Sequence, residues 1–163
     1  MSKIVNISKR NNFVIKAIRG TLEHRAIWLY LLLKEAEKKG LQWEEIGYPA
    51  TKSCGHFQGN NLVKLGGTES FKGLKKKLFT KPAQMVFDMK ILECTDDKLS
   101  IDFGYCPLVK AWQDMGCTDE EIERLCDIAM NGDRGIAESF GGRMELGETI
   151  AKGNSRCQIR FIK

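Results

Sequence analysis

Apolar residues recur at the spacing of an α-helix through the first half of the chain. In the window 14–39 the residues at this spacing are Ile18, Leu22, Leu29, Leu33 and Ala36. Gly40 is a good stop signal for this long N-terminal helix. Residues 26–33 are apolar nearly all round, so we expect the helix to be buried on more than one side. A weaker helix is expected over residues 43–65, interrupted near Pro49, and a short one over residues 68–79.

The pattern then changes to the alternation of β-strands. Residues 84–92 and 98–105 predict a hairpin around the turn at 95–97. A helix is expected from Pro107 to Met115, and a capping box at 118–121 opens another, which Gly132 interrupts. Two closing strands, over residues 143–151 and 156–162, flank a turn at 152–155.

This order of elements predicts an α+β fold with one antiparallel sheet of about four strands, packed by helices. A chain of 163 residues with ordinary composition is expected to form a single domain, 1–163. Its first part, 1–81, is helical and basic with net charge +10, and its second part, 82–163, carries −5. The lysines of 72–81 are interpreted as a solvated helix face, because the aromatic residues of a single-strand nucleic-acid site are missing.

The apolar runs and the pattern of the first residues indicate the cellular compartment of the protein. The longest apolar run, residues 27–33, is far short of a membrane span, and the first residues lack a secretory-signal pattern. We therefore expect a cytoplasmic protein whose partner is a small molecule, with neither a membrane nor a nucleic acid; a homodimer is left open. In that compartment the six cysteines are expected to be thiols rather than disulfides.

Cys106-Pro107 is the most informative pair of residues. Proline is favoured at the first helical position, which makes Cys106 the expected N-cap where a strand pattern becomes a helical one. The free N–H groups at a helix start lower the pKa of a thiol there and favour a nucleophile. The alternative is a small buried residue at a strand–helix corner.

Other residues could join Cys106 in a site. Cys126 falls on the buried face of its helix, with Asp127 pointing off that face, and Cys157 opens the last strand. Asp133 follows Gly132 and is either a helix N-cap or a carboxylate aimed into a cleft as a general base. His56 could assist a thiol as a base, although no spacing connects it to Cys106.

An ordered set of fragments in the last 60 residues resembles a named family. The fragments are Tyr105-Cys106-Pro107-Leu108, Leu125-Cys126-Asp127, Gly132-Asp133, Thr149-Ile150-Ala151-Lys152-Gly153, Cys157 and Arg160-Phe161. They resemble the L-2-amino-thiazoline-4-carboxylic acid hydrolase family of small bacterial proteins. The ending 153–157 also resembles 4-vinyl-reductase-type small-molecule-binding domains, in some of which cysteines and an acidic residue hold zinc. Thr149 stands where one of those cysteines would fall.

The resemblance implies hydrolytic opening of a cyclic amidine-like C=N–C–S ring to a carbamoyl-cysteine, classed with hydrolysis of non-peptide carbon–nitrogen bonds. Cys106 would attack directly, or Asp133 would activate water, with Cys126 and Cys157 in the catalytic set. Asp127, Thr149, Arg160 and His56 are the expected substrate-binding residues, Arg160 or a lysine binding the carboxylate. No cofactor is expected; zinc held by Cys106, Cys126 and Cys157 is a lesser alternative. A non-catalytic binding or sensor module is the competing function.

Overall fold

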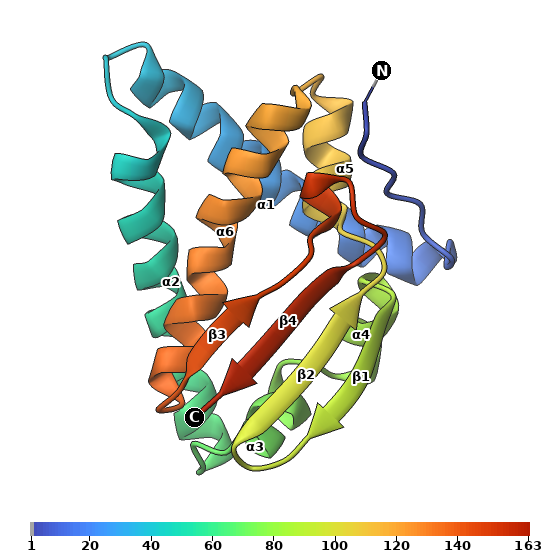
Figure 1. Ribbon diagram of the computed structural model, residues 1–163, viewed down its shortest axis with the longest axis vertical. Coiled ribbons are helices and arrows are strands. Elements are labelled where there is room, and N and C mark those ends of the chain that lie inside the picture. Colours follow the sequence, from blue (N-terminus) through green and yellow to red (C-terminus); the bar gives the residue numbers. More distant parts are fainter. Residues whose placement is uncertain (1) are drawn as a thin grey trace.

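The computed structural model describes residues 2–163, and its centre is a four-stranded antiparallel sheet of order β1-β2-β4-β3 (Figure 1). The strands are β1 (Met89–Cys94), β2 (Lys98–Phe103), β3 (Arg143–Leu146) and β4 (Cys157–Ile162). Central strand β2 pairs with β4 so that Leu99 faces Phe161 and Phe103 faces Cys157. These side chains point to the helices, whereas Asp102 and Arg160 point to the other face, as strand alternation requires. The expected α+β fold with four antiparallel strands is confirmed.

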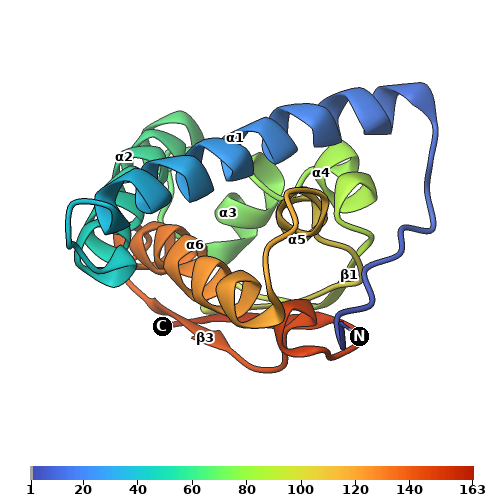
Figure 2. The same ribbon diagram turned by 90° about the horizontal axis from the view of Figure 1, so that it is seen from above.

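The helices lie on one face of this sheet (Figure 2). They are α1 (Phe13–Glu37), α2 (Trp43–Gly66), α3 (Phe71–Lys77), α4 (Lys81–Val86), α5 (Pro107–Asp114) and α6 (Asp119–Ser139), with a 3-10 turn η1 (Ile150–Lys152). The long N-terminal helix expected from the sequence is α1, which crosses the top of the helical layer in this view. The capping box at Thr118 is formed as predicted, with Glu121 reaching back to the Thr118 N–H.

Two helix breaks that the sequence predicted do not occur within residues 2–163. Helix α2 continues through Pro49, and α6 continues through Gly132. The glycines of these two helices let their backbones approach closely: a Cβ built on Gly55 would lie 2.0 Å from the carbonyl oxygen of Gly132. The missing side chain of Gly55 therefore permits this close contact, and α6 packs against α2 at Gly132 instead of ending there. Asp133 consequently lies inside a helix, and its predicted role as an N-cap is wrong.

Two predicted strands are shorter than expected. The first residues of the 84–92 window belong to α4, whose second residue is Pro82, and the chain turns at Asp88 with φ +49 before β1 starts. Strand β3 ends at Leu146, because Thr149 then caps η1 by accepting the N–H of Lys152. Short apolar runs do not distinguish helix from strand, which accounts for the first error.

An irregular N-terminal strap, residues 2–12, runs over the fold. Near its start, Asp119 accepts hydrogen bonds from the Ser2 hydroxyl at 2.6 Å and from the Lys3 N–H at 2.8 Å. Ile4 is buried in the core. The strap therefore contacts α6 before it reaches the start of α1.

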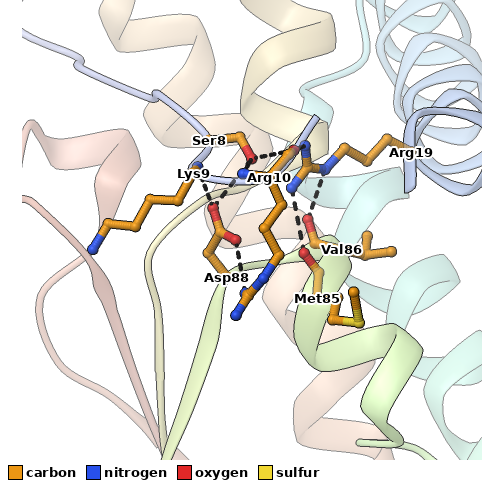
Figure 3. Close-up of polar contacts among 7 residues, drawn as sticks. All are labelled: Ser8, Lys9, Arg10, Arg19, Met85, Val86 and Asp88. Carbon is orange, nitrogen blue, oxygen red and sulfur yellow. Dashed lines mark hydrogen bonds and ion pairs between the residues drawn. The ribbon is translucent and has the colours of Figure 1, made fainter. Parts of the chain in front are cut away.

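A polar cluster fastens the far end of the strap (Figure 3). The Asp88 carboxylate accepts hydrogen bonds from the Ser8 hydroxyl, the Lys9 N–H and the Arg10 guanidinium. Beside it, the buried guanidinium of Arg19 donates to the carbonyls of Val86 at 2.8 Å and Arg10 at 2.6 Å. These contacts hold residues 8–10 against the turn at Asp88, between α4 and β1.

Candidate functional site

Cys106 is the N-cap of α5, as the Cys-Pro pair predicted. Its extended backbone, φ −129 and ψ 112, leads from the end of β2 into Pro107. The strap fixes this corner: the Asn6 amide donates to the Cys106 carbonyl at 2.7 Å and accepts the Cys106 N–H at 3.0 Å. The thiol is therefore held between a central strand, a helix start and the N-terminal segment.

The expected low pKa of this thiol is wrong. Burial raises the pKa of Cys106, and this effect outweighs the N–H groups of Val109 and Leu108, which lower it. The Asp133 carboxylate raises it further. Cys106 is consequently a neutral thiol near pH 7, because the cost of desolvation exceeds the benefit of the helix N-terminus.

Cys126 and Cys157 lie close to Cys106 in the buried interior. The pKa of Cys126 is raised well above its usual range, first by burial and then by Cys106 and Cys157. Burial also raises the pKa of Cys157 to about 12, and its sulfur accepts the Ile150 N–H at 3.3 Å. The structure thus brings together the three predicted cysteines, all as free thiols.

Metal-ligand geometry is a separate question. Residues 2–163 contain no group of three His, Cys, Asp or Glu side chains arranged to hold a metal ion. The zinc set considered from the sequence, Cys106, Cys126 and Cys157, is therefore not assembled as a metal centre.

Asp133 is the acidic member of this group. Burial raises the pKa of its carboxyl to about 6, although Arg25 and Arg134 act to lower it. A hydrogen bond from the backbone N–H of Asp133 itself also acts to lower this pKa, but burial outweighs it. A carboxylate with a pKa near the working pH is suited to accept and return a proton.

An open cavity of about 520 Å³ lies over Cys126. Asp127 and Thr149, two of the predicted substrate-binding residues, line it together with Tyr48 and Arg134. Asp127 accepts the Tyr48 hydroxyl at 2.5 Å and an Arg134 N–H at 3.3 Å. Thr149 is buried and caps η1, so the main contribution of its side chain is to shape the cavity wall.

The other two predicted substrate-binding residues lie elsewhere. His56 is on α2, where its Nε2 is 3.1 Å from a Glu138 carboxylate oxygen. Arg160 is on the sheet face turned away from the helices, where it donates to Asp102 at 2.8 Å. Cys157 and Arg160 are three residues apart in one strand and so point to opposite faces, a signal that the sequence already contained.

Sequence reasoning missed Asn6 and the two arginines near Asp133. Arg134 is the neighbour of Asp133 in the chain, so proximity alone could have suggested it. Arg25 and Asn6 come from the first half of the sequence, and no local pattern connects them to Cys106 or Asp133. Only the packing of α1 and the strap over α5 and α6 brings them there.

Comparison with known proteins gives two findings. The profile of a family described as L-2-amino-thiazoline-4-carboxylic acid hydrolase matches residues 19–161. A solved structure of trafficking protein particle complex subunit 3 from Naegleria fowleri, covalently bound to palmitic acid, has a similar fold. Its TM-score is 0.54 at 18% identity, covering 86% of this chain and 94% of that chain. The search of curated proteins gives no match.

None of the helices within residues 2–163 has both the length and the hydrophobicity that crossing a bilayer requires.

Proposed function

Because this chain belongs to the L-2-amino-thiazoline-4-carboxylic acid hydrolase family, we propose that it hydrolyses a small cyclic C=N heterocycle of that type at the Cys106–Asp133 site. The substrate would be L-2-amino-thiazoline-4-carboxylate or a close analogue, and the product a carbamoyl-cysteine. The observation that carries the proposal is the raised pKa of Asp133, about 6, beside a neutral thiol.

The proposed reaction begins with water attacking the ring carbon that is bonded to both nitrogens and to sulfur. Asp133 accepts a proton from this water and passes it to the ring nitrogen. The new hydroxyl then loses its proton as the carbon–sulfur bond breaks, and Asp133 returns that proton to the sulfur. Both nitrogens stay on the carbon, as a carbamoyl product requires, so the ring bond that breaks is C–S.

A neutral Cys106 fits this route better than direct attack by the thiol. Thiolate is the nucleophilic form of cysteine, and burial disfavours it here. Cys106 would instead be a neutral neighbour of Asp133, and Cys126 would connect this group of thiols to the cavity of about 520 Å³ that it lines. Direct attack by Cys106 stays a separate prediction, which the variants below distinguish from the water route.

The substrate carboxylate needs a cation, and Arg25 is the best placed. Arg25 acts on the pKa of both Asp133 and Cys106, which places it near both groups. No ion pair engages it among residues 2–163, whereas Arg134 is paired with Asp127. Arg25 would therefore bind the carboxylate and orient the ring toward Asp133.

The test is incubation of the purified protein with L-2-amino-thiazoline-4-carboxylate, followed by mass spectrometry of ring loss and carbamoyl-cysteine. Asp133→Asn is expected to lower kcat by a factor of about 10² to 10⁴, the usual worth of a general base. Arg25→Gln is expected to raise KM. His56→Gln is the matched control: the His56 side chain pairs with Glu138 between α2 and α6, and turnover should be unchanged.

The Cys106→Ala variant separates the two routes. We expect it to keep turnover within about tenfold of the wild type, since the thiol does not attack. Complete loss in Cys106→Ala, with activity retained in Asp133→Asn, would contradict the water route and assign the nucleophile to the thiol. No turnover in a well-folded wild type would overturn the proposed activity.

A binding module without chemistry is the second candidate function. The observation that favours it is the fold similarity to a trafficking subunit that was solved with covalently bound palmitic acid. Iodoacetamide kinetics address it: the exposed Cys54 should react fast and Cys106, Cys126 and Cys157 slowly. If L-2-amino-thiazoline-4-carboxylate slows alkylation of the buried thiols and is not itself consumed, the result would favour binding over hydrolysis.

A further inference from the structure

The outward side of α1 is apolar although no part of residues 2–163 covers it. We define the outer face of α1 as Phe13, Val14, Ala17, Gly20, Thr21, His24, Trp28, Leu31 and Leu32. Its five large hydrophobic residues, Phe13, Val14, Trp28, Leu31 and Leu32, are 85%, 63%, 61%, 48% and 63% exposed. The nine residues carry no formal charge at pH 7 when His24 is neutral, and the exposed Arg25 and Glu35 border them on the same side of the helix. A solvent-facing helix side normally carries charged residues, so this face has the composition of an interface.

The sequence pattern gives the same result independently. Residues 26–33 predict burial on more than one side of the helix, but the fold buries only the side that carries Ala26 and Leu33. Figure 2 shows α1 as the outermost helix, on the side of the molecule opposite the sheet. The second apolar side of α1 is therefore left uncovered by residues 2–163.

Gly20 adds a separate observation. It lies inside α1, where glycine destabilises a helix relative to alanine. A Cβ built on Gly20 would meet no atom within 4 Å, unlike the α2 glycines that contact α6. Nothing within residues 2–163 needs Gly20 to lack a side chain, whereas the close approach of another helix would.

We propose that the occupant of this face is a second copy of the chain, whose α1 packs antiparallel to the first about a twofold axis near residues 21–24. An isologous contact needs a surface that complements itself, and the outer face meets this condition. In this register Trp28 of each copy lies over the small residues Ala17 and Gly20 of the other. Leu31 and Leu32 lie over Phe13 and Val14.

The dimensions agree with a stable dimer. A helix of 25 residues is about 37 Å long at 1.5 Å per residue. The five exposed hydrophobic residues present on the order of 500 Å², given that an aromatic side chain alone buries about 150–250 Å². With the small residues between them, the face approaches the roughly 800 Å² per partner of a standard interface.

The polar N–H of Trp28 already has a hydrogen-bond partner within its own helix. The indole N–H donates to the His24 Nε2 at 3.1 Å within the same helix, and the two rings meet edge to face. Packing a second helix over Trp28 would therefore leave no unpaired donor. A lipid surface could also take up apolar side chains, but it would not need the gap at Gly20 or the large-to-small order along α1.

The experiment is sedimentation velocity of the full chain, with light scattering for mass. The wild type is expected at twice the monomer mass of 18.5 kDa. Leu31→Glu should weaken the dimer at least about thirty-fold, because it would bury a charge against Phe13 and Val14 of the other copy. Leu92→Glu is the matched control: Leu92 is also 48% exposed, but it lies on β1 of the sheet, and its dimer should be unchanged.

Exchange of the large and small residues tests the register. Trp28→Ala and Ala17→Trp should each weaken the dimer, and the double variant should restore it, because these positions face each other. Far-UV circular dichroism confirms that each variant is folded. A monomeric wild type, a monomer that binds anionic vesicles through this face, or a dimer that Leu92→Glu breaks and Leu31→Glu spares would overturn the proposal.

Discussion

Replacement of Gly55 by alanine tests the contact between α2 and α6. The new Cβ would lie 2.0 Å from the Gly132 carbonyl oxygen, and ordinary contact begins near 3.4 Å. The two helices would have to separate locally by about 1.4 Å, because the atom in the way is backbone and has no other rotamer.

The expected loss follows from two opposing effects. Overpacking costs about 1–3 kcal/mol and more when backbone must move, so we take ~3–4 kcal/mol here. Alanine regains about 1 kcal/mol over glycine inside a helix. The net destabilisation is therefore about 2–3 kcal/mol, which for a chain of this size lowers Tm by roughly 5–10 °C.

Urea unfolding followed by circular dichroism measures this change, and Gly132→Ala is the control. Gly132 is also inside a helix, but its Cβ would lie at an ordinary 3.6 Å from the Thr51 carbonyl oxygen. We expect Gly132→Ala to stabilise the protein by about 0.5–1 kcal/mol. Equal stability of the Gly55→Ala and Gly132→Ala variants would refute the close approach of the helices.

Three further predictions concern charged groups. Arg19→Met should cost about 2–4 kcal/mol in urea unfolding, because the carbonyls of Val86 and Arg10 lose their buried donor. The pKa of Asp133, about 6, is raised above its unfolded value near 3.9, so its contribution to stability is present below pH 4 and is lost as pH rises through 6. Asp133→Asn should therefore gain ~2–3 kcal/mol over the wild type at pH 7 and nothing below pH 4, and parallel pH curves would contradict this. Asp88→Ala should release the strap and speed proteolysis within residues 2–12, since it removes three acceptor contacts and leaves a side chain at φ +49.

Local signals in the sequence predicted local structure well. The capping box at Thr118, the Cys106 N-cap and the alternation of 98–103 each depend on neighbours within a few residues, and the structure contains all three. Gly132 shows the limit of such rules. Its local preference is to end a helix, but contact with α2 keeps α6 continuous.

The chemistry of the site was harder to predict for the same reason. Cys106 was placed correctly, but the direction of its pKa shift depends on burial by segments far away in the chain. Arg25 and Asn6 lie in the first half of the sequence, where no local pattern connects them to Cys106 or Asp133. The opposite orientation of Cys157 and Arg160 could have been read from strand alternation, and it was overlooked.

The N-terminal strap has a consequence for the order in which the chain folds. Its contacts join Ser2 to Asp119, Asn6 to Cys106 and Lys9 to Asp88, which are 117, 100 and 79 positions apart. During synthesis, therefore, residues 2–12 cannot dock until residues beyond 119 have left the ribosome and α6 has begun to form. Closing such long loops carries a large entropic cost that only a formed surface repays. The strap is thus made before the surface that it contacts and docks late, and the corner at Cys106 is completed only when it does.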